Sequence, residues 1–581
     1  MPSDEILTAA REWLAHDPDP DSRAELRSLI EADSDELAER FTGPLTFGTA
    51  GLRGILGAGE SRMNRAVIRR TTAGLAAYLV AQVAETKQRG VVVGYDGRRQ
   101  SDVFARDTAA VLSAAGIPCW LSESVCPTPL VAFAVKQLGA VAGVMVTASH
   151  NPPQYNGYKV YAKNGAQIFP PAERYIAEAI DGVPPADEIP TMPLDEAAAV
   201  GTLQIFGADL ERQYLDGLKT LYPQTGGNRS IPVVYTALHG VGDRLFRPAM
   251  SEAGFTTVDS VAEQAEPDGR FPTVEFPNPE EPGAMDLVLA LARKRKAALV
   301  LANDPDADRL AAAVLGPDGT YVQLSGNELG VLLGHHLLTR DATDDPDRLV
   351  VISLVSSPWL GVIARALGVA FEETLTGFKW IANRAMALER EAGKRFVFGY
   401  EEALGYTVGT LVRDKDGISA AVVLATLAAE LADRGETLLD ERERIVRRYG
   451  LFASKQRAIR FESASGAEQM RTIMTTLRDE VPTTIGGCPV EVVSDYQRRT
   501  RQARGGPPEN MDVPQSNVLV FALKGGHRVV ARPSGTEPKL KIYMDVREPL
   551  ADDEPLSAAQ GRAEERMAAL EADMVRLAGV D

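Results

Sequence analysis

Short runs of apolar residues recur along this chain and alternate with longer segments in which apolar residues are spaced by three or four positions. The short runs are continuous rather than alternating, which is typical of strands buried by helices on both faces of a sheet. The longer segments, for example 65–84 and 327–338, predict amphipathic helices. The alternation therefore predicts an α/β fold built from repeated βαβ units. The expected strands span residues 91–94, 142–146, 298–302, 349–353, 396–399 and 529–531.

The length of 581 residues exceeds what one hydrophobic core supports, and a typical domain size predicts about four domains. Stretches rich in Pro, Gly and Asp mark the expected boundaries, at 181–193, 316–319 and 434–436, the last preceding a charged helix at 442–448. We expect domains at 1–205, 206–322, 323–437 and 438–581. The first three share a plan in which a polar loop follows an apolar strand, and the fourth is expected to be a smaller α+β domain.

The composition is that of a folded globular protein, with 45% hydrophobic and 24% charged residues. The formal net charge of −18 argues against a surface devoted to nucleic acid or to anionic lipid, because both are bound through clustered Lys and Arg. An anionic substrate would need a locally basic pocket.

Cys119, Cys126 and Cys488 are too few and too scattered for a disulfide framework or a zinc site, which predicts a reducing compartment. The amino terminus is acidic and amphipathic, unlike a secretory signal. The longest apolar run, 418–429, is shorter than the roughly 20 residues that cross a bilayer. We therefore expect a cytoplasmic protein without a membrane partner.

Ligands of open α/β sheets collect beyond the carboxyl ends of the strands, so polar loops that follow apolar runs are the candidate sites. The first such loop, 147–153, holds Ser149 on a tight turn closed by proline, where its hydroxyl, presented outward, could carry a phosphoryl group. An ordinary Asn-Pro turn is the alternative. A hydrolase triad is disfavoured, because Ser149 and His150 are adjacent and adjacent side chains seldom point at each other.

The second loop, 303–309, places Asp304, Asp306 and Asp308 at alternate positions after an expected strand. Three carboxylates on a bent loop can converge on one hard cation, and oxygen ligands suit Mg²⁺. An EF-hand is excluded because Arg309 and Leu315 stand where that motif requires glycine and glutamate. A solvated acidic turn is the alternative, although Arg309 could hold a phosphoryl group in transit.

The third loop carries Glu401 and Glu402 just after the strand at 396–399, where carboxylates could accept hydrogen bonds from sugar hydroxyls. The alternative is a helix start with acidic residues near its amino-terminal dipole.

The fourth loop follows the strand at 529–531 and could cradle a phosphate that binds without reacting. A plain turn with surface cations is the alternative. The residues expected to contact that phosphate are Arg532, Ser534, Gly535 and Thr536.

These four loops, in this order, resemble those of the α-D-phosphohexomutase superfamily, which includes phosphoglucomutases and phosphomannomutases. The resemblance covers nearly the whole chain and begins with FGTAGLRG at 47–54 and GYDGR at 94–98. It implies four domains around a central cleft, each contributing one loop. It also implies a small-molecule sugar phosphate as substrate, Mg²⁺ as cofactor and a sugar bisphosphate as activator.

The resemblance assigns a role to each matching position. Ser149 is implied to be the phosphoserine, with Asp304, Asp306, Asp308 and a phosphoserine oxygen as the Mg²⁺ ligands. His150 and Lys159 match positions implicated in proton transfer, and Arg53 and Arg309 match positions that line the transfer site. The implied substrate contacts are Thr376, Gly377, Lys379, Glu401 and Glu402 for the sugar, and Arg532, Ser534, Gly535 and Thr536 for the distal phosphate.

The expected activity is an intramolecular phosphotransfer that interconverts the 1-phosphate and the 6-phosphate or 5-phosphate of a sugar, most simply as a phosphoglucomutase or phosphomannomutase. Many relatives carry serine two residues after the sugar-binding glutamate, where this chain has Ala403. That form resembles the branch with phosphopentomutase-like and glucose-1,6-bisphosphate-synthase-like members, so both activities stay open. A phosphosugar phosphatase and a non-catalytic sugar-phosphate sensor are further alternatives.

Overall fold

The computed structural model describes residues 3–48, 51–340, 345–461, 466–534 and 539–579. The chain divides into two compact units, residues 1–329 with 378–435 and residues 330–377 with 436–581. Each unit contains strands and helices that the apolar pattern predicts, and the six expected strands all form. The expected helices at 65–84, 327–338 and 442–448 also form, as α4 (Arg65–Gln82), α14 (Gly326–Arg340) and α18 (Leu438–Tyr449).

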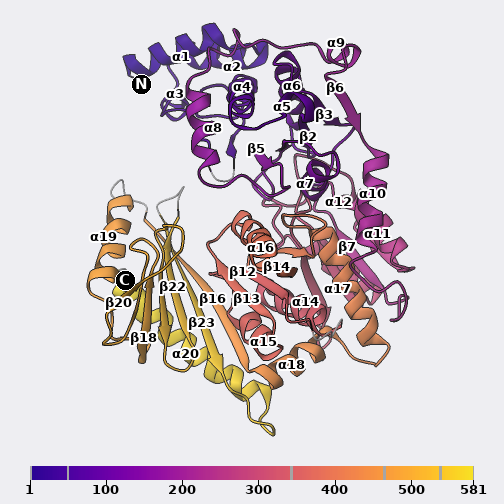
Figure 1. Cartoon of the computed structure of the whole chain (residues 1–581), viewed down its shortest axis with the longest axis vertical. Helices are drawn as coiled ribbons and strands as arrows, with labels where there is room; N and C mark the ends of the chain where they lie inside the picture. The colour runs from indigo at the N-terminus through magenta and orange to yellow at the C-terminus, as the bar shows by residue number, and fades with distance from the viewer. Residues whose placement is uncertain (1–2, 49–50, 341–344, 462–465, 535–538, 580–581) are drawn as a thin grey trace. The chain divides into compact units, whose positions relative to one another are not determined.

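The first unit begins with α1 (Asp4–His16), α2 (Pro20–Glu31) and α3 (Glu36–Arg40), followed by a mixed six-stranded sheet in the order β1-β5-β4-β2-β3-β6 (Figure 1). β2, β3, β4 and β6 run parallel, while β5 is antiparallel to β4 and β1 to β5. α6 and α7 pack against β2 and β4, whose side chains are therefore almost all buried. The bounds are β1 (Leu52–Ile55), β2 (Val91–Tyr95), β3 (Cys119–Ser122), β4 (Ala142–Val146), β5 (Tyr155–Ala162), β6 (Leu203–Phe206), α5 (Thr86–Arg89), α6 (Ser101–Ala114), α7 (Thr128–Gln137), α8 (Ala172–Asp181) and α9 (Leu194–Ala199).

A second mixed sheet of the same unit has the order β11-β10-β9-β7-β8, with β7 parallel to β8 and β9. The unit ends with the antiparallel hairpin of β14 and β15, preceded by α16 and followed by α17. α17 contains the apolar run at 418–429, which is almost entirely buried. The bounds are β7 (Val233–Thr236), β8 (Val258–Ser260), β9 (Leu299–Ala302), β10 (Ala311–Leu315), β11 (Tyr321–Leu324), β14 (Arg395–Glu401), β15 (Gly405–Val408), α10 (Ala208–Leu218), α11 (Asp243–Glu252), α12 (Ala262–Ala265), α13 (Asp286–Arg295), α16 (Phe378–Ala392) and α17 (Gly417–Ala432).

The second unit contains the parallel pair β12 and β13 and an antiparallel eight-stranded sheet in the order β16-β23-β22-β21-β18-β19-β20, with β17 beside β18. α20 packs on β16 and β23, so the carboxyl-terminal part is α+β as expected (Figure 1). The bounds are β12 (Arg348–Ser353), β13 (Ala370–Thr374), β16 (Leu451–Arg460), β17 (Thr484–Ile485), β18 (Cys488–Asp495), β19 (Thr500–Ala503), β20 (Pro508–Asn510), β21 (Leu519–Leu523), β22 (Arg528–Pro533), β23 (Lys539–Glu548), α15 (Trp359–Ala366), α19 (Gly466–Asp479) and α20 (Leu556–Leu577).

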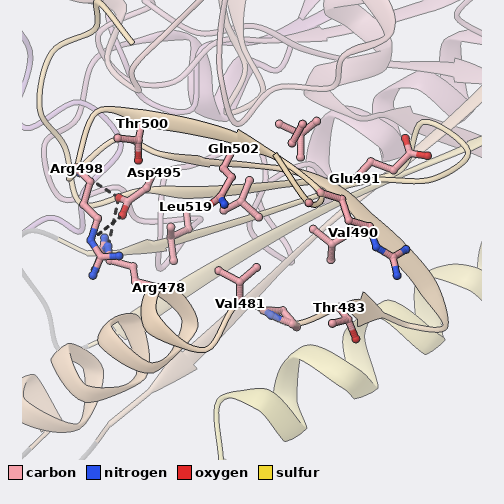
Figure 2. A pocket seen from close by; sticks show the side chains of 16 residues that line it. Arg478, Val481, Thr483, Val490, Glu491, Asp495, Arg498, Thr500, Gln502 and Leu519 are labelled. Carbon is pink, nitrogen blue, oxygen red and sulfur yellow. Dashed lines mark hydrogen bonds and ion pairs between the residues drawn. The ribbon is translucent and has the colours of Figure 1, made fainter. Parts of the chain in front are cut away.

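An open pocket lies on this last sheet, between β18, β19 and the segment that follows α19 (Figure 2). Arg478 and Arg498 both reach the carboxylate of Asp495. Arg498 also pairs with Asp479. The charges of these two arginines are therefore compensated within the domain.

The three cysteines are free thiols and all are buried. Within the part of the chain that the structure describes, no helix has both the length and the apolar character needed to span a bilayer.

Replacing one glycine in each unit by alanine tests the packing, and the two replacements should change the stability in opposite directions. A Cβ at Gly94 in β2 would lie 2.4 Å from Val131 Cγ2 and 2.7 Å from Cys126 Sγ, so Gly94→Ala should destabilise the first unit by about 1–3 kcal/mol. A Cβ at Gly561 in α20 would meet none of the described residues within 4 Å, so Gly561→Ala should stabilise the second unit by about 0.5–1 kcal/mol. Calorimetry measures the change in unfolding free energy for each variant. Changes of the same sign in both variants would contradict this packing.

Candidate functional site

The loop that follows β4 holds Ser149 in an unusual backbone conformation. Its φ is +52°, in the left-handed region that residues other than glycine seldom adopt. The Ser149 amide donates to Thr147 Oγ1 at 2.8 Å, which stabilises the turn. The side chain is only 3% exposed, so the expectation of an outward-facing serine is wrong. Ser149 instead points inward, toward a second loop of the same unit.

Arg98 holds the Ser149 loop from behind. Its guanidinium donates to the carbonyls of Ser149 and Asn151, both at 2.5 Å, and to those of Pro152 at 3.0 Å and Tyr155 at 3.2 Å. Arg98 is itself buried and lies 3.4 Å from the carboxylate of Asp96. One buried cation therefore fixes three backbone carbonyls of the loop and one at the start of β5.

The second loop, 303–309, brings Asp304, Asp306 and Asp308 together. One oxygen of each carboxylate lies within 4.8 Å of the others, and all three side chains are buried. Ser149 Oγ donates to Asp304 Oδ2 at 2.8 Å, which joins the two loops. The Arg309 amide donates to Asp304 Oδ1 at 3.0 Å. The expected convergence of the three carboxylates is therefore present, and a solvated acidic turn is excluded.

Two lysines offset the charge of these aspartates. Lys159 Nζ lies 2.7 Å from Asp306 Oδ2 and 3.0 Å from Asp308 Oδ2. Lys415 Nζ lies 3.2 Å from Asp308 Oδ2. The Thr128 hydroxyl donates to Asp306 Oδ2 at 2.5 Å. Buried charges are stable only with partners of this kind.

The same surroundings shift the pKa values of the three carboxylates in different directions. Burial and the negative charges of Asp306 and Asp308 raise the pKa of Asp304 well above its usual range. Burial also raises the pKa of Asp308, but the cations of Lys159, Lys415 and Arg309 outweigh it and lower that pKa overall. Asp306 behaves like Asp308, because Lys159 and Thr128 outweigh burial and leave its pKa lowered.

The residues present fit a metal ion. Asp306 Oδ1 and Asp308 Oδ1 are buried and have no hydrogen-bond partner among the described residues, which is costly for a carboxylate oxygen without a cation. All the candidate donors are oxygens, the ligand type that suits Mg²⁺.

His150, within the Ser149 loop, and Arg53, in β1, both contact residues of this loop. His150 Nδ1 is 3.3 Å from Ser149 Oγ, so the expectation that these adjacent side chains point apart is wrong. The left-handed backbone at Ser149 permits the approach. Burial and the cations of Arg309 and Arg53 lower the pKa of His150 well below its usual value. Arg53 donates to Asn151 Oδ1 at 2.9 Å.

Glu401 ends β14, and Glu402 lies in the turn to β15, so the alternative of a helix start is wrong here. Leu310 N donates to the Leu404 carbonyl at 3.0 Å, which ties this turn to the loop of three aspartates. Glu401 also contributes to raising the pKa of Lys415.

Lys379 is buried in the first turn of α16, two residues after Gly377 in the sequence. Burial lowers its pKa to about 8.

Arg532 lies near the end of β22, and the Ser534 amide donates to the Lys539 carbonyl at 2.8 Å. Both belong to the second unit and are described there alone. Gly535 and Thr536 lie outside the described residues.

Sequence reasoning missed Arg98, Thr128 and Lys415. Lys415 had a visible signal, because it stands in the polar cluster 413–416 directly before the apolar run at 418–429. Arg98 belonged to a recognised segment, but nothing in the sequence shows that it would reach the carbonyls of residues 51 to 54 positions away. Thr128 is an ordinary helix-start threonine until the fold places Asp306 beside it.

Three family models match the chain in succession. They are the phosphoglucomutase/phosphomannomutase α/β/α domains I, II and III, over residues 44–185, 212–316 and 325–449.

The chain is 42% identical to a probable phosphomannomutase of Haemophilus influenzae, over 84% of this chain and 93% of the relative. It is 38% identical to the phosphopentomutase of Homo sapiens, over 94% and 92%.

The fold is similar to that of the exocytosis-sensitive phosphoprotein parafusin, a phosphoglucomutase from Paramecium. The TM-score is 0.67 at 18% identity, over 93% of this chain and 97% of that one. This likeness concerns the fold, whereas the family models and the sequence identities concern ancestry. The chain therefore belongs to the phosphoglucomutase/phosphomannomutase family of the α-D-phosphohexomutase superfamily and is a phosphosugar mutase.

Proposed function

We propose that the chain interconverts the 1-phosphate and 6-phosphate of a hexose through a phosphorylated Ser149 and a sugar bisphosphate. The observation that carries this proposal is the hydroxyl of Ser149, held 2.8 Å from Asp304 beside two further buried carboxylates. A serine in that position can carry a phosphoryl group next to a bound cation. Phosphoryl transfer asks a protein mainly for such alignment and for neutralisation of charge.

The first half-reaction moves the phosphoryl group from Ser149 Oγ to the free hydroxyl of the sugar monophosphate. The bond from phosphorus to the serine oxygen breaks, a bond to the sugar oxygen forms, and the hydroxyl proton leaves to a base. The product is a sugar bisphosphate. The bisphosphate then reorients so that its other phosphoryl group faces Ser149 Oγ. That phosphoryl group moves to Ser149 Oγ, its bond to the sugar oxygen breaks, and the sugar oxygen takes a proton back from the protonated base. The phosphoserine is regenerated, which accounts for a sugar bisphosphate as activator.

Asp304, Asp306 and Asp308, with an oxygen of the phosphorylated Ser149, would hold Mg²⁺. Bound there, Mg²⁺ would supply positive charge against the negative charge of the transferring group. Arg309 follows these ligands in the loop, and Arg53 interacts electrostatically with all three aspartates. Both guanidiniums are suited to hold phosphoryl oxygens, because they stay charged and donate in a fixed fork.

His150 is the better candidate to accept the proton of the sugar hydroxyl. Its imidazole lies 3.3 Å from Ser149 Oγ, and burial together with the cations of Arg309 and Arg53 lowers its pKa and so favours the neutral form. Lys159 is held between two carboxylates that favour its charged form. A charged ammonium donates protons but does not accept them, so Lys159 fits a role in holding charge at the centre.

The remaining contacts follow from the chemistry of the substrate. Glu401 and Glu402 would accept hydrogen bonds from sugar hydroxyls, while Thr376, Gly377 and Lys379 would orient the sugar. Arg532, Ser534, Gly535 and Thr536 would hold the phosphate that does not react. This distal group must accept either end of the bisphosphate, so donors that recognise phosphate alone are suited to it.

The human relative named a phosphopentomutase and the alanine at 403 keep a pentose phosphate as the second candidate substrate. A glucose-1,6-bisphosphate synthase would instead accumulate the bisphosphate. A phosphatase would release inorganic phosphate, and a sensor would bind without turnover. One panel of 1-phosphosugars, assayed with Mg²⁺ and a catalytic amount of sugar bisphosphate, separates these outcomes by their products.

Ser149→Ala should lower isomerisation in that panel by at least about 1,000-fold, because the acceptor oxygen is lost. It should also abolish the mass increase of one phosphate that we expect after incubation with a sugar bisphosphate. Ser251→Ala, at an exposed position in α11, is the matched control and should keep both the isomerisation activity and the mass increase. Full activity of Ser149→Ala would contradict the proposed mechanism.

Arg98→Lys tests the positioning of the Ser149 loop. A single ammonium cannot serve four carbonyls, so the change should cost about 3–5 kcal/mol of stability in the first unit. It should also accelerate amide hydrogen exchange at 147–157 and lower kcat more than it raises KM. Arg99→Lys is the control, since Arg99 is exposed and its guanidinium reaches the Pro153 carbonyl only at 3.5 Å. Unchanged exchange in Arg98→Lys would contradict the role of Arg98.

Lys379 should make substrate binding depend on pH. Because burial lowers its pKa to about 8, its positive charge is present below pH 8 and is lost above it. KM for the sugar phosphate should therefore rise between pH 7 and pH 9, whereas Lys379→Arg, whose guanidinium stays charged, should flatten that rise. An identical profile in the two proteins would show that Lys379 does not bind the phosphosugar.

A further inference from the structure

The amino-terminal helices α1, α2 and α3 precede the first family-model match, which begins at residue 44. They have their own hydrophobic cluster, which includes Leu26, Leu37 and Phe41. Trp13 of α1 packs against both this cluster and the core of the six-stranded sheet. The three helices and the sheet domain therefore meet at Trp13.

Two cavities lie at this junction, with volumes of about 300 and 320 Å³. Trp13, Glu60 and Arg70 line both of them. Phe41 lines the first cavity, and Phe47 lines the second. These volumes are at the lower end of the range for small-molecule sites, and aromatic walls of this kind suit a planar body.

Arg70 of α4 differs from the other arginines of its helix. Arg65 and Arg69 both pair with Asp107. The Nε atom of Arg70 is buried and, among the described residues, has no hydrogen-bond partner. A buried guanidinium N–H without an acceptor is costly, so a ligand that accepts its hydrogen bonds would be bound favourably.

The other charges at the cavities limit what that ligand can be. Glu60 lines both cavities, Glu12 lines the first, and Asp181 lines the second. His16 of the first cavity is already bonded to Asp187. One guanidinium among several carboxylates favours a single negative charge over the double charge of a phosphate, and a carboxylate matches the fork of an arginine.

A residue that lines the second cavity is the neighbour of Arg53 in the sequence. Leu52, in β1, lines this cavity. Successive side chains of a strand point to opposite faces, so Leu52 faces the cavity while Arg53 reaches Asn151 of the Ser149 loop. Phe47 and Leu52 also flank Gly48 and Gly51, whose amides each donate to the carbonyl of the other. A ligand that fixes Phe47 and Leu52 would fix the strand that carries Arg53.

We propose that the junction at Trp13 and Arg70 is a regulatory site for a small aromatic monocarboxylate, which binds Arg70 and holds Phe47 and Leu52, the second of which neighbours Arg53 in β1. The regulatory part rests on the proposed function, in which Arg53 contacts the transferring group. The binding part does not.

Equilibrium dialysis of the full chain with indole-3-acetate tests the binding, in the absence of sugar phosphate. Indole-3-acetamide keeps the aromatic ring but lacks the negative charge, and acetate keeps the charge but lacks the ring. Both should bind at least about tenfold more weakly than indole-3-acetate. Arg70→Met should weaken indole-3-acetate binding to the same extent, and Arg70→Lys should restore part of it. Arg174→Met, an exposed arginine of α8, is the control and should bind as the wild type does.

Hydrogen exchange of the segment 44–56 gives the second readout. It should slow when indole-3-acetate binds to the wild type and should not change in Arg70→Met. If Arg70→Met fails to fold, Ala177→Phe, which fills the second cavity, should block binding in its place.

The outcomes separate this proposal from the proposed function. The site would be overturned, even with isomerisation intact, if indole-3-acetate shows no saturable binding to the wild type. It would also be overturned if folded Arg70→Met or Ala177→Phe binds indole-3-acetate with the same affinity as the wild type. Binding and slowed exchange without any isomerisation would overturn the proposed function and leave the site in place.

Discussion

The repulsion among three buried carboxylates is the constraint on which the first unit depends. Asp304, Asp306 and Asp308 lie within 4.8 Å of one another, away from water. Such a group is stable only if cations and donors surround it. Lys159 comes from β5, Lys415 from the segment before α17, and the hydroxyl of Thr128 from the start of α7. The burial of this loop therefore depends on residues from three distant parts of the chain.

The Ser149 loop likewise depends on stabilising contacts from other parts of the unit. A serine at φ +52° carries backbone strain, which persists only where the surroundings enforce it. Arg98 enforces it by binding three carbonyls of the loop and that of Tyr155 in β5, and Asp96 in turn stabilises Arg98. The result is a hydroxyl fixed against Asp304 before any ligand arrives. Such preorganisation reduces the cost of aligning groups during a reaction.

The sequence predicted the strands and the two polar loops of the centre because apolar runs and turn residues are local signals. The convergence of three aspartates also followed from local spacing. The orientation of Ser149 did not, because burial depends on a second loop 155 residues away. His150 was misjudged for a related reason, since the usual geometry of neighbouring side chains does not hold at a left-handed residue. Arg98, Thr128 and Lys415 act through tertiary contacts that leave no periodicity in the sequence.

The charge balance of the centre has a consequence for stability. Asp306 Oδ1 and Asp308 Oδ1 are buried and, among the described residues, have no partner, although Lys159 and Lys415 engage the other oxygens of the same carboxylates. The protein thus neutralises one side of the group and leaves the other side to a cation. A ligand that binds only the folded state adds its binding free energy to the stability of that state. Function and stability are therefore joined at these carboxylates, and the first unit gives up part of its stability to keep a cation site open.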